Sequence, residues 1–200
     1  PLATLRSQVC IVAQDTFLFS DTIGSNISFG AGDRGNRLEY NGQYDGQRRR
    51  RGYDEQYVRR MAAIAGADGF ISSMPDGYDT VVGERGVGLS GGQKQRLSLA
   101  RALADNPSIL IMDDTTSAVD METEAEIQRH LRDLDEKKTI VTIAHRISSV
   151  KDSDLILVLE HGRIVERGTH DELVASHGRY WQIYSKQLGV DAGRSQGFEA

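Results

Sequence analysis

Residues 89–103 read LSGGQKQRLSLARAL, in which a serine and two glycines open a helical pattern. Apolar side chains recur at helical spacing over residues 93–104, so we expect an amphipathic helix there. A serine and two glycines at a helix start leave backbone N–H groups unpaired and let a ligand approach closely. The helix dipole favours an anion at the same end. An ordinary helix N-cap at Ser90 would give the same three residues.

Two apolar runs later in the chain each lead into polar side chains. Residues 109–112 are followed directly by Asp113 and Asp114. A buried parallel strand would deliver those two carboxylates to the carboxyl edge of its sheet. Residues 139–143 are expected to form the next strand, with His145 two residues beyond it. For each pattern taken alone, a core strand with an acidic turn and a structural histidine are the alternatives.

Taken together and in this order, these motifs resemble those of ATP-binding-cassette (ABC) ATPases. Residues 89–103 resemble the signature motif, which in that family completes the nucleotide site of a second subunit. Residues 109–114 resemble the Walker B strand, where the first acid, here Asp113, helps to hold Mg²⁺. The resemblance therefore implies ATP and Mg²⁺ as cofactors. The signature residues that it implies in nucleotide binding are Ser90, Gly91, Gly92 and Gln93.

Three further motifs agree with this resemblance. Residues 9–19 resemble the Q-loop of exporters, in which Gln14 would sense Mg²⁺ and the attacking water and relay their state to the membrane domain. Residues 117–120 resemble the D-loop. Asp120 is thereby implied in nucleotide binding, although it could equally cap the helix expected up to residue 134. His145 resembles the switch histidine that contacts the γ-phosphate.

One position departs from the family pattern. The catalytic glutamate of ABC ATPases follows the Walker B aspartate, and this chain has Asp114 there. A carboxylate that is one methylene shorter lies farther from the γ-phosphate, and a misplacement of about 1 Å can lower a rate about a hundredfold. The chain thereby resembles the degenerate-site subunit of heterodimeric exporters, with a slow site of its own and an intact signature for its partner. The alternative is that Asp114 acts as a slow base in a homodimer.

The expected fold is α/β, a P-loop NTPase-like ABC ATPase domain with a helical signature subdomain. No Gly-Lys dipeptide occurs in the 200 residues, so the chain contains no Gly-x-x-x-x-Gly-Lys-Ser/Thr phosphate loop. Because the chain also begins at Pro1, we expect a C-terminal fragment of a longer polypeptide, truncated at the N-terminus and lacking Walker A. The resemblance covers residues 1–188, and residues 189–200 are expected to form a disordered tail.

Residues 31–53 interrupt the family pattern with five Gly, six Arg and almost no aliphatic side chains. Such a stretch cannot bury enough apolar surface to offset the entropy of ordering, so we expect a disordered insertion. Its run of four arginines at 48–51 could touch anionic lipid or an acidic partner. A solvated loop is the alternative.

Composition limits the other function classes. The net charge of −5 argues against a nucleic-acid surface, and no apolar run approaches the about 20 residues of a membrane helix. The single Cys10 excludes an internal disulfide and is expected to pack in a strand, which is consistent with the cytosol. DNA-repair and chromosome-maintenance ATPases separate their motifs by long coiled coils, whereas only 76 positions separate Gln14 from Ser90 here.

The function implied by the resemblance is ATP binding and hydrolysis in an exporter, at the cytoplasmic face of the cell membrane. The implied partners are a second ABC nucleotide-binding domain, in a heterodimeric half-transporter, and a transmembrane domain. The coupling helices of the transmembrane domain would contact Gln14 and residues 80–86 (TVVGERG), which resemble the X-loop of exporters. Two alternatives remain, a regulatory nucleotide-binding module with little turnover and an inert truncated fragment.

Overall fold

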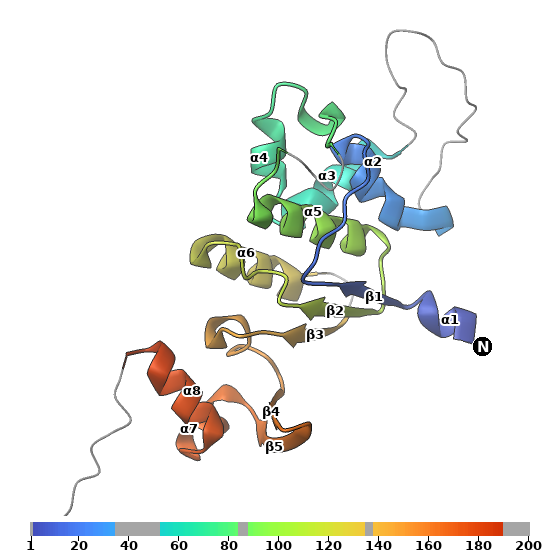
Figure 1. Ribbon diagram of the computed structural model, residues 1–200. Helices are drawn as coiled ribbons and strands as arrows, with labels where there is room; N and C mark the ends of the chain where they lie inside the picture. The colour runs from blue at the N-terminus through green and yellow to red at the C-terminus, as the bar shows by residue number, and fades with distance from the viewer. Residues whose placement is uncertain (1, 35–52, 84–87, 135–137, 190–200) are drawn as a thin grey trace, which may run out of the picture. The chain divides into compact units, whose positions relative to one another are not determined.

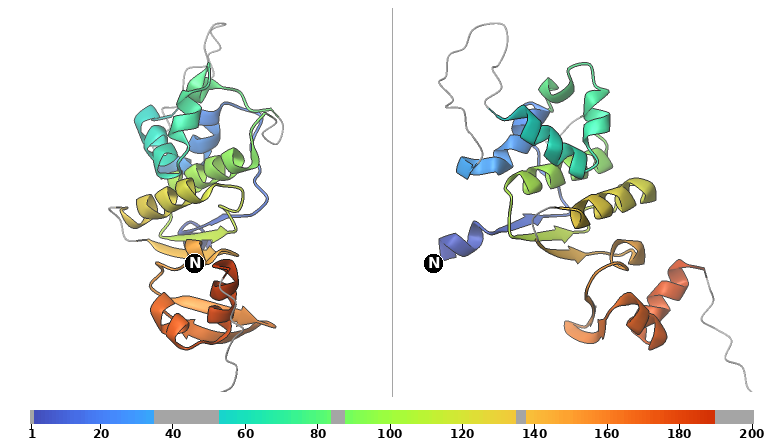
Figure 2. Two further views of the ribbon diagram at one scale, coloured as in Figure 1. Left: turned by 90° about the vertical axis from the view of Figure 1, so that its left-hand side faces the viewer. Right: turned by 180° about the vertical axis from the view of Figure 1, so that it is seen from behind.

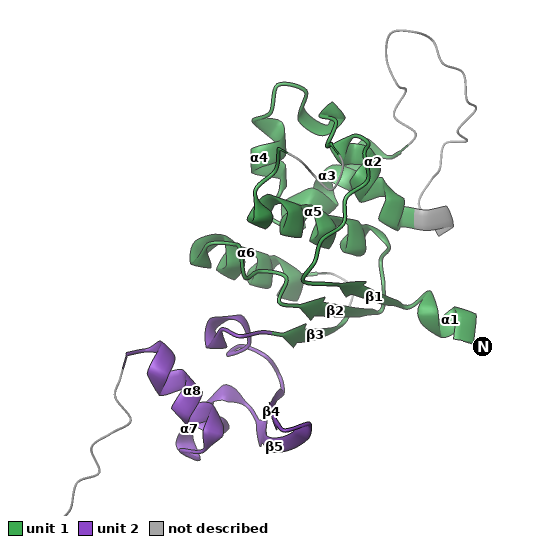
Figure 3. Cartoon of the chain, in the orientation of Figure 1, with its two compact units in different colours: residues 1–143 green, residues 144–200 purple. Residues whose placement is uncertain are grey.

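The computed structural model describes residues 2–34, 53–83, 88–134 and 138–189. The chain divides into two compact units, Pro1–Ile143 and Ala144–Ala200 (Figure 3). Each unit has a hydrophobic core of its own. The tail expected at residues 189–200 lies outside the described residues, apart from Gly189.

A three-stranded parallel sheet lies in the first unit (Figure 1). Val12 pairs with Met112, and Met112 pairs with Thr142, so the carboxyl ends of the three strands meet at one edge. The α/β fold predicted from the sequence is therefore confirmed. The strands, in their spatial order, are β1 (Val9–Val12), β2 (Ile109–Asp113) and β3 (Thr139–Ile143).

The two faces of this sheet differ in burial, because alternate side chains along a strand point to opposite sides. One face carries Val12 and Met112, which are each 1% exposed and belong to the core shared with α5 (Gly91–Ala104). The other face carries Ile11 and Ile143, which are 62% and 50% exposed. The described part of the first unit therefore covers only one face of the sheet.

The signature helix α5 begins at Gly91, two residues earlier than the apolar periodicity predicts. The hydroxyl of Ser90 accepts a hydrogen bond from the backbone N–H of Gln93, and the Gln93 side chain accepts one from the N–H of Ser90. This reciprocal capping box satisfies two of the unpaired donors at the helix start, so the helix extends back to the glycines.

The helix after Walker B, α6 (Met121–Arg132), begins directly after Asp120 and ends two residues before residue 134. The carboxylate of Asp120 accepts a hydrogen bond from the backbone N–H of Thr123. The N-cap that the sequence suggested for Asp120 is present, and it fixes where the helix starts.

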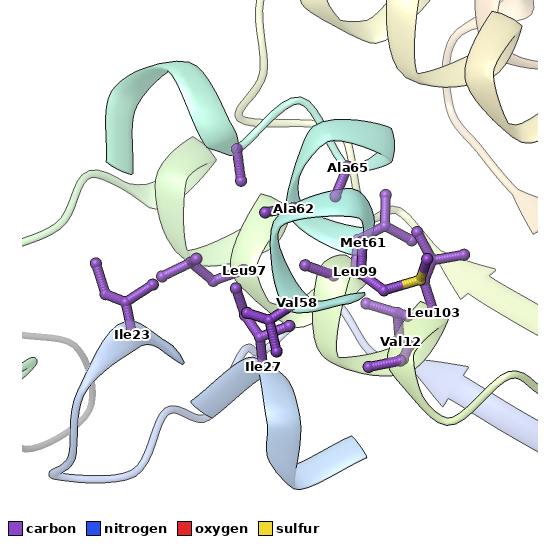
Figure 4. Close-up of a cluster of buried hydrophobic side chains, with 14 of the residues drawn as sticks. Val12, Ile23, Ile27, Val58, Met61, Ala62, Ala65, Leu97, Leu99 and Leu103 are labelled. Atoms are coloured by element: carbon purple, nitrogen blue, oxygen red, sulfur yellow. The ribbon is translucent and has the colours of Figure 1, made fainter. Parts of the chain in front are cut away.

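Short helices pack on α5 and complete the first unit (Figure 4). Leu97 and Leu99 of α5 are buried together with Ile23, Ile27 and Val58. These helices are α2 (Ile23–Ser28), α3 (Glu55–Ile64) and the 3-10 helix Phe29–Arg34. Helix α4 (Asp68–Ser72) packs against α3, and the 3-10 helix Gly77–Asp79 packs against α2 and α4. Among the residues described, no helix is long and apolar enough to cross a membrane.

Two ordered segments differ from the sequence-based expectation. Helix α1 (Leu2–Arg6) was not predicted, and none of its residues is buried. The 3-10 helix Phe29–Arg34 reaches into the expected insertion, where Ala31 is buried, and Tyr53 at the far end packs against the core. Residues 35–52 lie outside the described residues, so the disordered insertion expected at 31–53 stays a prediction.

The second unit is a β-hairpin with two helices packed against its second strand (Figure 2). Its antiparallel strands are β4 (Ile156–Glu160) and β5 (Arg163–Gly168). Between them, His161 and Gly162 have φ values of 49° and 74°, as a tight two-residue hairpin turn requires. Helices α7 (His170–Ala175) and α8 (Arg179–Gln187) follow. The buried core residues of this unit are Ile147, Ile156, Val158, Leu173 and Tyr180.

Candidate nucleotide-binding site

The parallel register of β1 and β2 brings two predicted site residues together. Gln14 and Asp114 each lie two residues beyond a paired position, Val12 and Met112. The Gln14 Nε2 donates a long hydrogen bond of 3.4 Å to Asp114 Oδ2. Asp113, the last residue of β2, is half-buried at the same edge. The sheet therefore gathers a carboxamide and two carboxylates at its carboxyl end.

The backbone of Asp114 is held on both sides. Its φ of 49° lies in the left-handed region, which aspartate tolerates better than most residues. Its N–H donates to the carbonyl of Ile143 at 2.9 Å, and its own carbonyl accepts from the Ser117 hydroxyl at 2.9 Å. These hydrogen bonds hold the backbone of Asp114 in place. The length of its side chain therefore determines how far the carboxylate extends from the turn.

The start of α5 has two exposed residues followed by one that packs closely against another segment. Ser90 and Gly91 are solvent-exposed, while Gly92 is buried. A Cβ added to Gly92 would lie 2.6 Å from the carbonyl oxygen of Ala118, so only glycine fits there. The structure therefore places the exposed helix start directly beside the segment that follows Walker B.

Asp120 carries a local hydrogen-bonding role. Its carboxylate accepts from the Thr123 N–H at 2.9 Å and from the Thr123 hydroxyl at 2.8 Å. These hydrogen bonds, the backbone N–H first, lower the pKa of the fully exposed Asp120 carboxyl. The capping role is thus shown, and the nucleotide contact expected of Asp120 stays a prediction.

His145 is placed by a contact within the second unit. Its carbonyl accepts a hydrogen bond of 2.7 Å from the Gln187 Nε2, and the Ile147 N–H donates to Gln187 Oε1 at 2.9 Å. Gln187 of α8 therefore fixes the backbone around His145. The phosphate contact expected of the His145 imidazole stays a prediction.

The predicted X-loop lies against the segment that follows the Q-loop. The N–H of Ile23 donates to the carbonyl of Thr80 at 2.9 Å, and the N–H of Val82 donates to the carbonyl of Asp21 at 3.0 Å. Val81, between these contacts, is 66% exposed. Residues 84–86 of the predicted loop lie outside the described residues.

An aromatic patch adjoins this segment. Phe17 and Phe29 are 55% and 60% exposed, and their rings lie 5.2 and 4.6 Å from the ring of Phe19 between them. Two mostly exposed rings therefore flank the half-buried Phe19 and form an aromatic patch with it.

Two site residues were missed in the sequence, and both lie on α5. The buried Gln95 hydrogen-bonds to the segment after Walker B. Arg101 donates from Nη2 to the carbonyl of Phe17 at 2.7 Å and places its guanidinium 5.3 Å from the ring centre of Phe19. Burial lowers the pKa of Arg101. The burial of Gln95 gives its amide a need for partners, which becomes apparent only in the folded structure.

A parallel sheet with acids at its carboxyl edge and a glycine-opened helix beside them is typical of nucleotide-binding α/β proteins. A family model described as ABC transporter matches residues 2–117, more than half of the chain, and the chain belongs to this family.

Relatives were found in both sequence and structure. An uncharacterized ABC transporter ATP-binding protein of Bacillus subtilis (strain 168), YknU, is 50% identical over 186 residues, 93% of this chain and 28% of YknU. The ATP-dependent lipid A-core flippase of Photobacterium profundum is 43% identical over 188 residues, 94% of this chain and 29% of the flippase. The structure of a bacterial Atm1-family ABC exporter with ATP bound has a TM-score of 0.79 and 41% identity, covering 94% of this chain and 30% of the exporter. The chain thus spans less than a third of the length of these relatives.

Proposed function

We propose that this chain is part of the ATP-binding domain of an ABC exporter, in which ATP-driven pairing of two such domains powers export across the membrane. The observation that carries the proposal is that one chain holds two different half-sites. Gln14 and Asp114 meet at the sheet edge, and Ser90 and Gly91 stand exposed at the start of a 14-residue helix. The names of the flippase and of the ATP-bound exporter support the same activity.

The sheet edge fits the magnesium–phosphate part of this chain's own site. Mg²⁺ in such sites takes one or two carboxylates together with phosphate oxygens and water. Asp113 and Gln14 offer oxygen ligands of that kind, and no group of three or more His, Cys, Asp or Glu side chains that could cage a metal occurs in the described residues. Bound Mg²⁺ would neutralise charge on the phosphates. Asp114 would hold the attacking water, and Gln14 would orient both.

The exposed start of α5 fits a phosphate group of the partner's nucleotide. Its free N–H groups and the helix dipole favour an anion there. The Ser90 hydroxyl accepts the capping hydrogen bond from Gln93 at 3.3 Å, and its own proton can be donated to a phosphate oxygen. Ser90, Gly91, Gly92 and Gln93 would thereby complete the second half of a site whose Walker motifs belong to the partner.

The aromatic patch gives the proposed transmembrane contact a physical basis. Phe17, Phe29 and Val81 are large apolar side chains that lie mostly in solvent. We assign this surface, with residues 80–82, to the coupling helices of a transmembrane domain at the cytoplasmic face. The burial of these side chains would drive the contact.

Asp114 is the reason for assigning the chain to the slow half of a heterodimer. Its backbone is fixed by hydrogen bonds, so the turn is not free to move a short carboxylate forward. A partner with a catalytic glutamate would then carry most of the turnover, completed by the signature of this chain.

The testing experiment measures ATP hydrolysis and ATP-dependent transport by the exporter polypeptide that contains this chain, together with its partner, in membrane vesicles. We expect hydrolysis that depends on Mg²⁺ and that requires both nucleotide-binding domains. ATP binding without turnover would instead support the regulatory module. A melting curve of the 200-residue chain by circular dichroism that shows no cooperative unfolding would support the inert fragment.

A further inference from the structure

Gln95 joins the signature helix to the segment that follows Walker B. It lies in the second turn of α5 and is only 6% exposed. Its Oε1 accepts a hydrogen bond from the N–H of Ala118 at 3.1 Å. Its Nε2 donates to the hydroxyl of Ser117 at 3.2 Å and reaches the carbonyl of Asp114 at 3.5 Å. One amide side chain therefore serves three residues of the same turn.

The chemistry of this contact requires an amide. The Ser117 hydroxyl already donates its proton to the Asp114 carbonyl at 2.9 Å, so Gln95 must approach it as a donor. The N–H of Ala118 at the same time needs an acceptor. A glutamate at position 95 could accept but not donate, and a methionine could do neither well. Both the shape and the hydrogen-bonding pattern of glutamine are used.

A second contact one turn earlier fixes the same geometry. Gly92 lies three residues before Gln95 on the same helix face, and a Cβ on it would meet the Ala118 carbonyl at 2.6 Å. The helix and the turn are therefore in backbone contact at Gly92 and hydrogen-bonded at Gln95. A shift of the exposed Ser90 end must move the turn with it, because packed groups do not slide freely.

The far end of the turn is anchored to α6. The Thr116 hydroxyl donates to Glu124 Oε1 at 2.7 Å, and both side chains are buried. Asp120 caps the same helix. Residues 114–120 thus run from the Asp114 carboxylate at the sheet edge to the start of α6. Gly92 and Gln95 of α5 contact the middle of this segment.

We propose that Gln95 is a positioning residue that couples the two half-sites of this chain. When the partner's nucleotide engages Ser90 and Gly91, Gln95 transmits the displacement of α5 to residues 114–118. It thereby sets the position of the Asp114 carboxylate in the chain's own site. This inference rests on the proposed function, since it needs a partner nucleotide at the signature.

The first test uses hydrogen exchange in the exporter polypeptide, with and without ATP. In the unsubstituted protein, ATP should protect both the signature residues 88–93 and the turn 114–120. In Gln95→Ala and Gln95→Glu, the signature should remain protected while the turn loses its ATP-dependent protection. Equal protection of the turn in all three proteins would overturn the inference. No protection of the signature in the unsubstituted protein would instead overturn the proposed function.

The second test is a kinetic double-mutant cycle. The cycle is measured with Asp114→Glu in this chain and the partner's catalytic glutamate replaced by glutamine, so that only this site contributes and its carboxylate is active. In that background Gln95→Ala should lower kcat about tenfold or more with KM for ATP changed less than about twofold, because positioning is lost and nucleotide binding is not. Adding Ser117→Ala to Gln95→Ala should cost little more, since residues in one network are not additive. Additive losses would reduce Gln95 to a stability residue and contradict the proposal.

Ser98→Ala provides the matched control. Ser98 lies one turn further along α5, away from the exposed helix start, and within the described part of the chain its side chain makes no hydrogen bond to residues 114–120. Its kcat and its exchange pattern should match those of its parent protein in each test. A loss as large as that of Gln95→Ala would attribute the effect to any truncation on α5 and would overturn the inference.

Discussion

At the scale of single residues, the two acids at the end of β2 differ in how far their carboxylates extend from the strand. Asp113 ends the strand, whereas Asp114 occupies a left-handed turn tied to Ile143 and Ser117. Its carboxylate lies near Gln14 without a short hydrogen bond, at 3.4 Å. A longer side chain on the same turn would move the carboxylate outward while the backbone stays in place.

Substitution of Asp114 by glutamate should therefore raise hydrolysis at this chain's own site. The extra methylene restores reach to the attacking water, with a gain of up to about a hundredfold if misplacement alone limits the rate. Hydrolysis should be measured in the exporter with the partner's catalytic glutamate replaced by glutamine, so that only this site contributes. In that background Asp114→Asn should change the low rate little. A large loss in Asp114→Asn would mean that Asp114 is a working base, as in the homodimer alternative.

Ser90 permits a test of the signature in trans. Ser90→Arg should fill the space of the partner's phosphate and abolish hydrolysis at the partner's site, although every hydrolytic residue there is intact. Ser72→Arg, at an exposed serine of α4, is the control and should leave turnover unchanged. Normal turnover of Ser90→Arg would show that the signature does not act on the partner's nucleotide.

At the scale of elements, α5 connects the three surfaces to which functions are proposed above. Its start faces the proposed partner nucleotide, Gln95 holds the turn after Walker B, and Arg101 near its end holds the aromatic patch. Fourteen residues of helix extend about 20 Å. A single rigid helix therefore links points that are far apart on the first unit.

Loss of the Arg101 side chain should destabilise the packing at the C-terminal end of α5. Arg101→Met removes the hydrogen bond to the Phe17 carbonyl and the contact with the Phe19 ring. It should therefore lower the free energy of unfolding by about 2 kcal/mol. Arg101→Lys should recover part of this, because lysine keeps the charge without the planar fork. Urea unfolding followed by circular dichroism measures the difference. Arg129→Met, which removes a mostly exposed ion pair, should cost less than about 0.5 kcal/mol, and an equal loss in both would contradict the assignment.

The elements could be predicted wherever the sequence carries both a cap and a periodicity. Thr169 and Glu172 follow the Thr-x-x-Glu pattern of a capping box and form one at the start of α7, and β3 has its predicted bounds. The start of α5 was placed too late because the apolar stripe begins after the cap, and the capping geometry decides where a helix begins. The meeting of Gln14 with Asp114 follows from parallel strands. The partners of Gln95 could not be predicted, because they depend on how a turn folds back on a helix.

At the scale of the whole molecule, both units expose apolar sheet surface. Ile11 and Ile143 lie on the open face of the parallel sheet, and Leu159 and Ile164 of the hairpin are 65% and 58% exposed. Apolar patches of this kind lower solubility and mark surfaces that bind other protein. The described residues thus bury their cores without covering every strand, and a melting curve by circular dichroism would show how stable the 200-residue chain is on its own.

The chain by itself should show no measurable ATPase activity and at most weak nucleotide binding. Phosphate loops hold the β- and γ-phosphates through backbone N–H groups and a lysine, and no such Gly-x-x-x-x-Gly-Lys sequence occurs in these 200 residues. Asp113, Asp114 and Gln14 would contact Mg²⁺ and water, and they supply few of the contacts that hold the nucleotide itself. Titration calorimetry of the purified chain with Mg²⁺–ATP checks this directly. Tight binding would reveal a nucleotide site built from other residues and would require a different division of labour between this chain and its partner.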